Sequence, residues 1–404
     1  ILRVKAEYPV KLWPNAVQAY HRWIREAVRT NMPYDAFARA LLTSSGSNFR
    51  VPPVNFYRAM QDHDPETIAA AAALTFMGVR LDRWPVAKRE ELAGCFSRVS
   101  FKGTAEWKEE IVFLDPSAMT PLKLFFPDGK TVTVPPGRDP RAAFADWLLA
   151  PENAWFARNA VNRVWAWLFG RGIVHEPDDM RPDNPPVHPD LLDFLASELV
   201  NAEYDLRYIY RLILNSETYQ RSSIPDSPDP RAEALFAHYM TRQLDAEVIV
   251  DALCDLSGTH EQYSSPIPEP FTFIPPEHRT IALADGSITS PFLEMFGRPP
   301  RDTGLWSERG RGPTDKQRLH MLNSSHIQNK IERGPRMRRL LAGRRGREDH
   351  PIRTLYLSIL SRPPTDEELQ TARAYLNRSG VTATQGGHDL AWALLNSKEF
   401  LYRH

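Results

Sequence analysis

Cysteine is scarce in this chain of 404 residues, which contains only Cys95 and Cys254. Two cysteines are too few for a disulfide framework, and their separation excludes a C-x-x-C redox or metal pair. The sequence leaves open whether these two residues form a single bridge.

Long apolar runs are also missing. The longest, Ile68–Val79, has 12 residues, well short of the ~20 needed to cross a bilayer, so we expect no membrane span. The sequence has no G-x-S-x-G elbow, no G-x-x-x-x-G-K-[ST] phosphate loop and no G-x-G-x-x-G after a predicted strand. A nucleotide-binding protein or a serine hydrolase therefore has little support.

Lysine is the rare cation, because 40 of the 50 basic residues are arginine, and 50 acidic residues bring the net charge to zero. Codon usage in a GC-rich genome would explain this imbalance. The functional alternative is that guanidinium groups are needed for bidentate pairing with carboxylate, sulfate or phosphate. Proline is abundant instead, with 35 residues against about 5% in ordinary proteins, so many segments should end abruptly.

Apolar periodicity predicts a mainly α, multi-helical fold. In residues 13–31 the apolar side chains recur at the i, i+3, i+4 spacing of an amphipathic helix. Further helices are expected at 34–42, 64–78, 139–149, 153–169, 189–202, 205–217, 229–257, 314–331, 351–361, 365–378 and 388–402. Short β-branched or aromatic runs near 110–134, with a Pro127-Asp128-Gly129-Lys130 turn, predict a small β-hairpin element of about three strands.

A domain boundary is predicted at Pro135-Pro136-Gly137. It divides the chain into a helical domain at 1–137, which contains the small β element, and a helical domain at 138–404. The second domain carries a long insertion at about 258–313 that is rich in proline, glycine and polar residues. A loop of that length is usually functional or disordered.

The helix predicted at 153–169 and the loop after it carry the best group of candidate site residues. The candidate ligand-binding residues here are Asn162, Arg163, Trp165 and Asn184. Asp178, Asp179 and His188 are the candidate catalytic residues, as a general acid–base group. The same residues could instead hold a metal or form an Arg–Asp network that fixes the loop. No H-x-x-x-H or H-E-x-x-H spacing supports a metal, so we predict no metal ligand.

Positive charge is concentrated between residues 298 and 353, where 13 Arg and 2 Lys face six carboxylates. Arg298, Arg309, Arg338 and Arg339 are the candidate anion-binding residues in this segment. The segment could pair with the acidic loop at 175–190, bind an anionic glycan, dock a partner protein or bind nucleic acid. Nucleic acid is disfavoured, because Trp306 is the only tryptophan, tyrosine or phenylalanine there and single strands need several stacking rings.

Short motifs after residue 137 resemble those of a known family. They are Asp139-Pro140-Arg141, Asn162-Arg163-Val164-Trp165, Phe169-Gly170-Arg171-Gly172-Ile173-Val174, Asn184-Pro185-Pro186-Val187-His188-Pro189, Asn215-Ser216-Glu217-Thr218-Tyr219, Arg242-Gln243-Leu244-Asp245, Phe296-Gly297-Arg298-Pro299-Pro300 and Asn396-Ser397-Lys398-Glu399-Phe400. The pattern, over about 138–404, resembles the planctomycete-specific C-terminal domain of unknown function of large exported proteins. The resemblance implies an exported, periplasmic or cell-surface protein and no particular activity.

Residues 1–137 resemble part of a planctomycete cytochrome-like domain, on Met32-Pro33-Tyr34-Asp35 and Leu74-Thr75-Phe76-Met77-Gly78-Val79-Arg80. Relatives carry a C-x-x-C-H haem-attachment motif after the Gly-Val segment, whereas this chain continues Leu81-Asp82-Arg83-Trp84-Pro85. We therefore expect no cofactor in this chain. Haem c would belong to an upstream domain or a partner, since we expect a chain that starts at Ile1 to be a processed or trimmed product.

The leading functional prediction is a non-catalytic envelope module that binds an anionic polysaccharide or a partner protein. It would use the arginine-rich segment and the tryptophan-bearing helix. The first alternative is a glycan-acting hydrolase that uses Asp178, Asp179 and His188. The second is a redox accessory module that docks a c-type haem domain.

Overall fold

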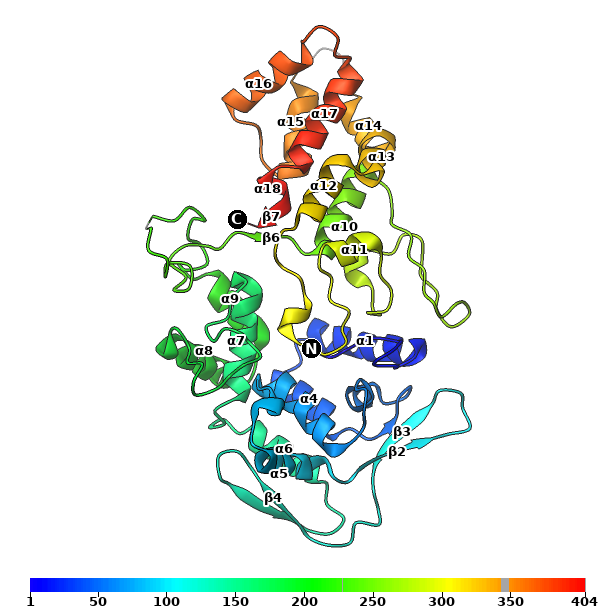
Figure 1. Ribbon diagram of the computed structural model, residues 1–404, viewed down its shortest axis with the longest axis vertical. Helices are drawn as coiled ribbons and strands as arrows, with labels where there is room; N and C mark the ends of the chain where they lie inside the picture. The colour runs from blue at the N-terminus through cyan, green and yellow to red at the C-terminus, as the bar shows by residue number, and fades with distance from the viewer. Residues whose placement is uncertain (227, 343–348, 404) are drawn as a thin grey trace. The chain divides into compact units, whose positions relative to one another are not determined.

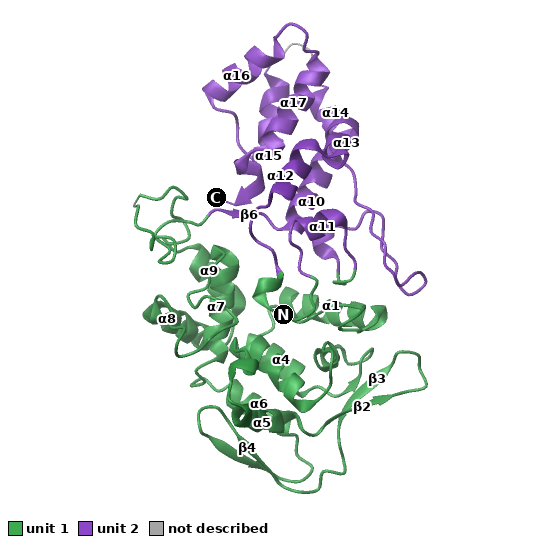
Figure 2. Ribbon diagram, in the orientation of Figure 1, with its two compact units in different colours: residues 1–240, 284–287, 300–308 green, residues 241–283, 288–299, 309–404 purple. Residues whose placement is uncertain are grey.

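The computed structural model describes residues 1–226, 228–342 and 349–403. Its regular elements are helices and short antiparallel strand pairs (Figure 1), which confirms the predicted mainly α fold with a small β component. The chain forms two compact units (Figure 2). Unit 1 contains residues 1–240, 284–287 and 300–308, and unit 2 contains 241–283, 288–299 and 309–404.

Unit 1 contains nine α-helices and five strands in its described part. The helices are α1 (Pro14–Arg29), α2 (Tyr34–Thr43), α3 (Asn55–Arg58), α4 (Pro65–Met77), α5 (Val86–Ala93), α6 (Pro140–Leu148), α7 (Phe156–Phe169), α8 (Pro189–Asn201) and α9 (Leu206–Leu214). The strands are β1 (Gly46–Ser47), β2 (Val99–Gly103), β3 (Glu110–Leu114), β4 (Leu122–Phe125) and β5 (Thr131–Val134).

The alanine-rich helix α4 lies at the centre of unit 1, because it is apolar on almost every side and packs against α5 and α7. Asp64 begins the helix, since its carboxylate accepts hydrogen bonds from the backbone N–H groups of Glu66 and Thr67. Gly78 ends it in the left-handed conformation, with φ 66°. The helix therefore begins and ends where the sequence predicted, at residues 64 and 78.

The β elements form two separate small sheets. Strand β3 pairs with β2 and β1 in the order β1-β3-β2, while β4 and β5 form a hairpin of their own. Gly129, at φ 85°, and the Asp128 side chain, which accepts from the Lys130 N–H at 3.1 Å, make the predicted hairpin turn. The prediction of one three-strand element was wrong about β3, because its other partner, β1, comes far earlier in the chain.

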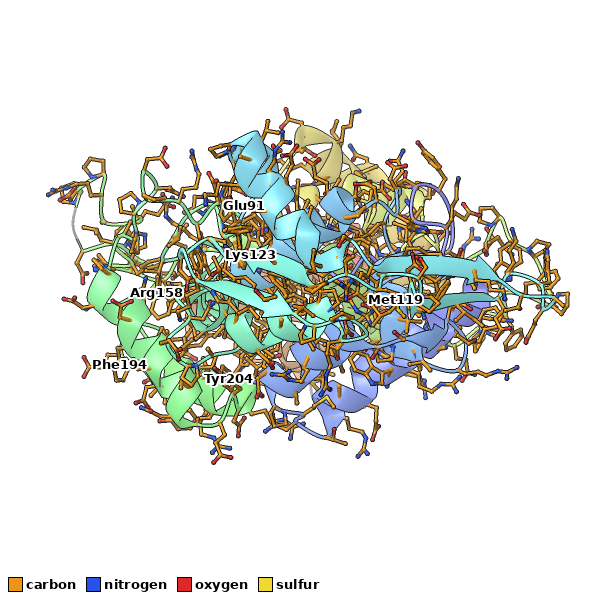
Figure 3. All side chains as sticks on the ribbon, turned by 90° about the horizontal axis from the view of Figure 1, so that it is seen from below. Glu91, Met119, Lys123, Arg158, Phe194 and Tyr204 are labelled. Atoms are coloured by element: carbon orange, nitrogen blue, oxygen red, sulfur yellow. The ribbon has the colours of Figure 1, made fainter. Side chains whose placement is uncertain are left out.

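Helix α7 begins later than predicted, because the Asn153 side chain accepts from the backbone N–H groups of Trp155 and Phe156. It ends at Gly170, with φ 81°. The helix is buried along most of its length and packs against α4 and α8. Helix α8 keeps one face in solvent, where Phe194 is about half exposed and points outward (Figure 3).

The predicted boundary at Pro135-Pro136 lies inside unit 1. Helices from both sides of it pack together, since α2 contacts α6 and α4 contacts α7. The division between compact units falls later in the chain, at residues 240–241.

Unit 2 is a helical unit with one short strand pair. Its elements are β6 (Arg242–Gln243), α10 (Ala246–Ser257), α11 (Pro291–Met295), α12 (Asp315–Asn323), α13 (Ser325–Arg333), α14 (Pro335–Leu341), α15 (His350–Leu360), α16 (Asp366–Leu376), α17 (Ala383–Leu395), α18 (Lys398–Leu401) and β7 (Tyr402–Arg403). Its core contains Ile249, Leu253, Ile327 and Leu355, all at most 1% exposed.

Two predictions for this part of the chain are corrected by the structure. The helix expected at 229–257 is formed only over α10, because Arg242 and Gln243 pair as β6 with β7 and Asp245 begins the helix. The helix expected at 314–331 is divided at Ser324, whose hydroxyl accepts from the Ile327 N–H and begins α13. The stretch 258–313 is described throughout and contains, besides α11, only 3-10 helices at Thr280–Ala282 and Trp306–Glu308.

Candidate functional site

A cleft of about 690 Å³ lies in unit 1 beside the N-terminal ends of α5, α7 and α8. Trp84 and Trp155 contribute indole rings to its wall. Six prolines also line it: Pro85, Pro127, Pro182, Pro185, Pro186 and Pro189. Proline fixes its own φ angle, so this part of the wall has little backbone freedom.

The loop that forms one side of the cleft is held by Asn162 on α7. The Asn162 side chain donates to the Val174 carbonyl at 3.0 Å and accepts from the Val174 N–H at 2.9 Å. Gly172 makes this approach possible, because a Cβ atom there would collide with the Val174 carbonyl oxygen. Asn162 was a predicted ligand-binding residue, but it is fully buried. Its two hydrogen bonds to Val174 instead position the loop, whose Asn184 lines the cleft.

Three cations line the cleft, against one carboxylate, that of Asp193. Lys88 pairs with Glu91 at 2.7 Å, and Arg158 pairs with Asp193 at 2.5 Å; Arg158 is labelled in Figure 3. The side chains of Lys88 and Arg158 are 47% and 43% exposed. Exposed ion pairs contribute only ~0–1 kcal/mol, so an anionic ligand could replace either carboxylate at small cost.

Arg181 is the third cation of the cleft, and it connects the cleft to Asp179, one of the predicted catalytic carboxylates. Its guanidinium contacts Asp179 at 2.8 Å and Asp183 at 3.1 Å. Asp179 also pairs with Arg83 at 2.6 Å. Asn184 donates from its side chain to the Asp179 carbonyl at 2.8 Å. Asp179 therefore lies in an Arg–Asp network of the kind considered for this loop from the sequence.

Asp178 is fully buried and binds Arg163, with 2.7 Å between its Oδ1 and the Arg163 Nη2. Its other oxygen accepts from the Trp306 N–H at 2.5 Å. Arg163 also donates to the side chain of Asn159 and to the Leu74 carbonyl. The pair joins α7 to the end of α4 and to the segment at 300–308, all within unit 1.

His188 lies apart from this pair, at the residue before α8, where its Nε2 is 3.3 Å from the Leu235 carbonyl oxygen. Trp165 is 2% exposed and stacks on Phe169, with 4.2 Å between ring centroids. Its ring is therefore part of the core of unit 1. Asp178, Asp179 and His188 have separate partners and form no shared acid–base arrangement in these contacts.

In unit 2, Arg298 and Arg309 converge on a buried carboxylate. Both oxygens of Glu247 accept from Arg309, at 2.9 and 3.0 Å, and Arg298 Nε lies 3.6 Å from Glu247 Oε1. Burial by itself raises the pKa of Glu247, but the hydrogen bonds from Arg309 together with the charges of Arg309 and Arg298 and a backbone hydrogen bond outweigh it, so the pKa is lowered. Glu247 neutralises much of the positive charge predicted for this part of the arginine-rich segment.

Arg338 and Arg339 lie on α14 and are exposed. They donate to backbone carbonyls, of Glu332 at 3.3 Å and Pro335 at 3.4 Å. Neither forms an ion pair within the described ranges 1–226, 228–342 and 349–403. The two residues keep their charge available to an external anion. Arg344, Arg345 and Arg347 of the same predicted segment lie outside the described residues.

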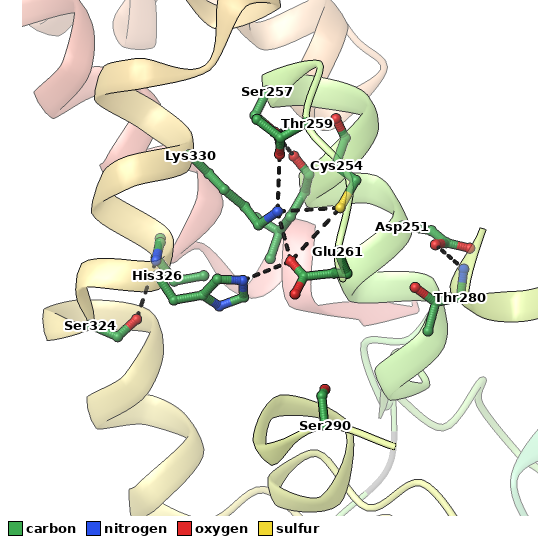
Figure 4. A network of polar contacts seen from close by, with 12 residues as sticks. Asp251, Cys254, Ser257, Thr259, Glu261, Thr280, Ser290, Ser324, His326 and Lys330 are labelled. Atoms are coloured by element: carbon green, nitrogen blue, oxygen red, sulfur yellow. Dashed lines mark hydrogen bonds and ion pairs between the residues drawn. The ribbon is translucent and has the colours of Figure 1, made fainter. Parts of the chain in front are cut away.

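A polar network in unit 2, not predicted from the sequence, surrounds Lys330 of α13 (Figure 4). The ammonium group lies 2.8 Å from Glu261 Oε1, 3.0 Å from Thr259 Oγ1 and 3.3 Å from Cys254 Sγ. His326 contacts the same carboxylate oxygen at 2.8 Å. Burial is the main cause that raises the pKa of the Cys254 thiol. The network fastens residues 259–261 to α10 and α13.

This network predicts a loss of stability in acid. Burial by itself would raise the pKa of Glu261, but the hydrogen bonds and the charges of His326 and Lys330 together outweigh it and lower the pKa from 4.5 to about 2. A lowered pKa in the folded state stabilises above pH 4.5, and this stabilisation disappears as the pH falls toward 2. Glu261→Gln should therefore flatten the decline in the free energy of unfolding below pH 4.5, measured by urea denaturation. If the free energy of unfolding of this variant declined below pH 4.5 as steeply as that of the unmodified protein, Glu261 would not be the cause of the acid sensitivity.

No group of three or more His, Cys, Asp or Glu side chains in the described part of the chain is placed to hold a metal ion. The described residues also include no helix that is long and apolar enough to span a bilayer. Cys95 is buried and Cys254 partly buried, and neither forms a disulfide.

These features describe a mainly helical protein with a proline-lined cleft in unit 1 and a helical unit 2. Residues 140–376 match the model of the PSD1 family, described as proteins of unknown function (DUF1553). The match covers more than half of the chain, so the chain belongs to this family. No curated protein and no solved structure matches the chain.

The matched range begins close to the boundary predicted at 138 and contains α6, α7, α8 and α9 of unit 1 as well as most of unit 2. It contains Arg158, Asn184 and Asp193 of the cleft, whereas Trp84 and Lys88 precede it. Of the candidate site residues named from the sequence, only Asn184 lines this cleft, and its two tryptophans and three cations were not predicted: Trp84, Trp155, Lys88, Arg158 and Arg181. The sequence signal nearest to this cleft is the group of prolines at 182–189, four of which line it.

Proposed function

We propose that this protein is a non-catalytic binding module for an anionic polysaccharide, which binds in the cleft of unit 1. One observation carries the proposal: two tryptophan rings and three cations line the same cleft, within a wall of prolines. A flat indole ring offers an apolar surface to the apolar face of a sugar ring, and the cations fit sulfate or carboxylate substituents.

The charges of the cleft favour an anionic polymer over a neutral one. Guanidinium groups bind sulfate and carboxylate in a bidentate manner. Arg158 and Lys88 hold their present partners in exposed pairs, which a polymer with many anionic groups can displace. Arg338 and Arg339 of α14 would add attraction that depends on salt and not on the structure of the sugar.

Heparin is a suitable probe, because it is a sulfated polymer, and its binding to the full chain can be measured by calorimetry at several salt concentrations. Lys88→Gln with Arg158→Gln should weaken binding roughly tenfold, since each ion pair with the polymer is worth up to ~1 kcal/mol. Arg338→Ala with Arg339→Ala should weaken it less and mainly lower its salt dependence. The proposal would be contradicted if neither double variant weakened heparin binding, or if the affinity for heparin did not depend on the salt concentration.

The hydrolytic alternative lacks a favourable observation, because Asp178 and Asp179 both bind arginine. From the family resemblance alone, we also propose that the chain is exported and docks a c-type haem domain. Copurification with a haem protein tests this, and recovery of none would count against it.

A further inference from the structure

A second pocket, of about 850 Å³, lies in unit 2 among α15, α16 and α17, the three helices that are labelled in Figure 1. Each helix contributes an aromatic ring to its wall: Tyr356, Tyr375 and Trp392. Leu360, Leu390 and Leu394 add apolar surface. A pocket of this size can enclose several side chains of a peptide or a small organic molecule.

The charged groups that line this pocket are all carboxylates. They are Glu367, Glu368, Asp389 and Glu399. The wall is thus opposite in sign to that of the cleft in unit 1. A combination of aromatic rings and carboxylates is suited to a cation, which is attracted both to negative charge and to the face of a ring.

The chain itself already places a guanidinium against this wall. The Arg362 guanidinium carbon lies 5.6 Å from the centroid of the Tyr356 ring. The same group pairs with Glu368 at 2.7 Å and with Glu399 at 2.6 Å. Arg362 therefore pairs with two of the four carboxylates, and it shows that a guanidinium fits between carboxylates and an aromatic ring at this wall.

Asp389 and Glu367 are the carboxylates that Arg362 does not use. Asp389 accepts from the Tyr375 hydroxyl at 2.6 Å and from the Gln385 amide at 2.8 Å. Both donors are neutral, so they orient the carboxylate without cancelling its charge. Neither Asp389 nor Glu367 forms an ion pair within the described residues, and two negative charges at the pocket are left without a cation.

We propose that this pocket binds an arginine side chain from a basic segment of a partner protein. The guanidinium would stack on Tyr375 or Trp392 and pair with Asp389 and Glu367, as Arg362 does with its own ring and carboxylates. Arginine suits the site better than lysine, because a planar guanidinium both stacks and forms bidentate pairs. The three leucines of the pocket wall would contact apolar side chains that neighbour the arginine in the partner's segment. The proposal does not depend on polysaccharide binding in unit 1.

Calorimetry of the full chain with the peptide acetyl-Leu-Arg-Leu-Arg-amide at 0.15 M salt, about physiological ionic strength, tests the proposal. The matched peptides have Lys or Glu in place of Arg. The test variant is Glu367→Gln with Asp389→Asn. Asp366→Asn is the control, because Asp366 lies next to Glu367 on α16 but does not line the pocket.

We expect the arginine peptide to bind, and the lysine peptide to bind about threefold to fivefold more weakly because it lacks the stacking plane. The double variant should bind about tenfold more weakly, because neither substituted side chain can form an ion pair with the guanidinium. Asp366→Asn should change the affinity less than twofold, and the glutamate peptide should not bind. No binding of the arginine peptide, or equal effects of the test and control variants, would overturn the proposal. If spermidine bound as tightly as the arginine peptide, the ligand would be a small polyamine and not a protein segment, and the proposal would also be overturned.

Discussion

Asp178→Asn should destabilise unit 1 by about 3–5 kcal/mol, the cost of removing one partner of a buried ion pair. Asp178 is fully buried and Arg163 is 8% exposed, so the guanidinium left behind has little access to water. The asparagine keeps the size of the side chain and an oxygen for the Trp306 N–H. The change in stability therefore measures the charge and not the volume.

The measurement is urea denaturation followed by circular dichroism, with Asp193→Asn as the control. That control breaks the Arg158–Asp193 pair, in which both side chains are about half exposed, and should cost no more than ~1 kcal/mol. If Asp178→Asn were as mild as the control, the account of Asp178 as a structural residue would be wrong. A catalytic role for this carboxylate would then have to be tested again.

Glu247→Gln should have a similar effect in unit 2, again about 3–5 kcal/mol. Glu247 is 5% exposed, and its carboxylate is shared by two arginines of the sequence stretch 298–309. Without its charge, Arg298 and Arg309 would face each other across a neutral amide. The destabilisation should appear as a lower midpoint of urea denaturation.

Asp315→Asn is the matched control for Glu247, because Asp315 pairs with Arg318 on the surface of unit 2, with side chains 89% and 64% exposed. We expect it to change the free energy of unfolding by less than ~1 kcal/mol. If Glu247→Gln left the stability unchanged while heparin binding rose, the two arginines would be ligand-binding residues that Glu247 merely masks.

Much of the fold could be predicted from local sequence. The helices begin and end where capping residues stand, as at Asp64, Gly78 and Gly170, because these side chains and φ angles act within one helical turn. The predictions of secondary structure were wrong where the conformation depends on pairing between segments that are far apart in the sequence. The stretch 229–245 is not helical, since β6 pairs with β7 at the other end of the domain sequence, and no local pattern indicates that partner.

The candidate site was only partly predictable. The loop after the helix predicted at 153–169 was recognised as a place for a site, and its Asn184 lines the cleft. Trp84, Lys88 and Pro127 could not be associated with that loop, because tertiary packing alone brings α5 and the β4–β5 turn to its side. The excess of positive charge at 298–353 was visible, but its partner Glu247 precedes it by about 50 residues, and sequence gives no measure of such pairing.

The most direct test of the central claim is the affinity of heparin for the full chain before and after Trp84→Ala with Arg158→Gln. These changes remove one ring and one cation from the wall of the cleft and leave α14 intact. We predict at least a tenfold decrease in affinity, ~1.4 kcal/mol or more, with an unchanged denaturation midpoint. Undiminished affinity, together with loss of binding in Arg338→Ala with Arg339→Ala, would contradict the cleft as the binding site.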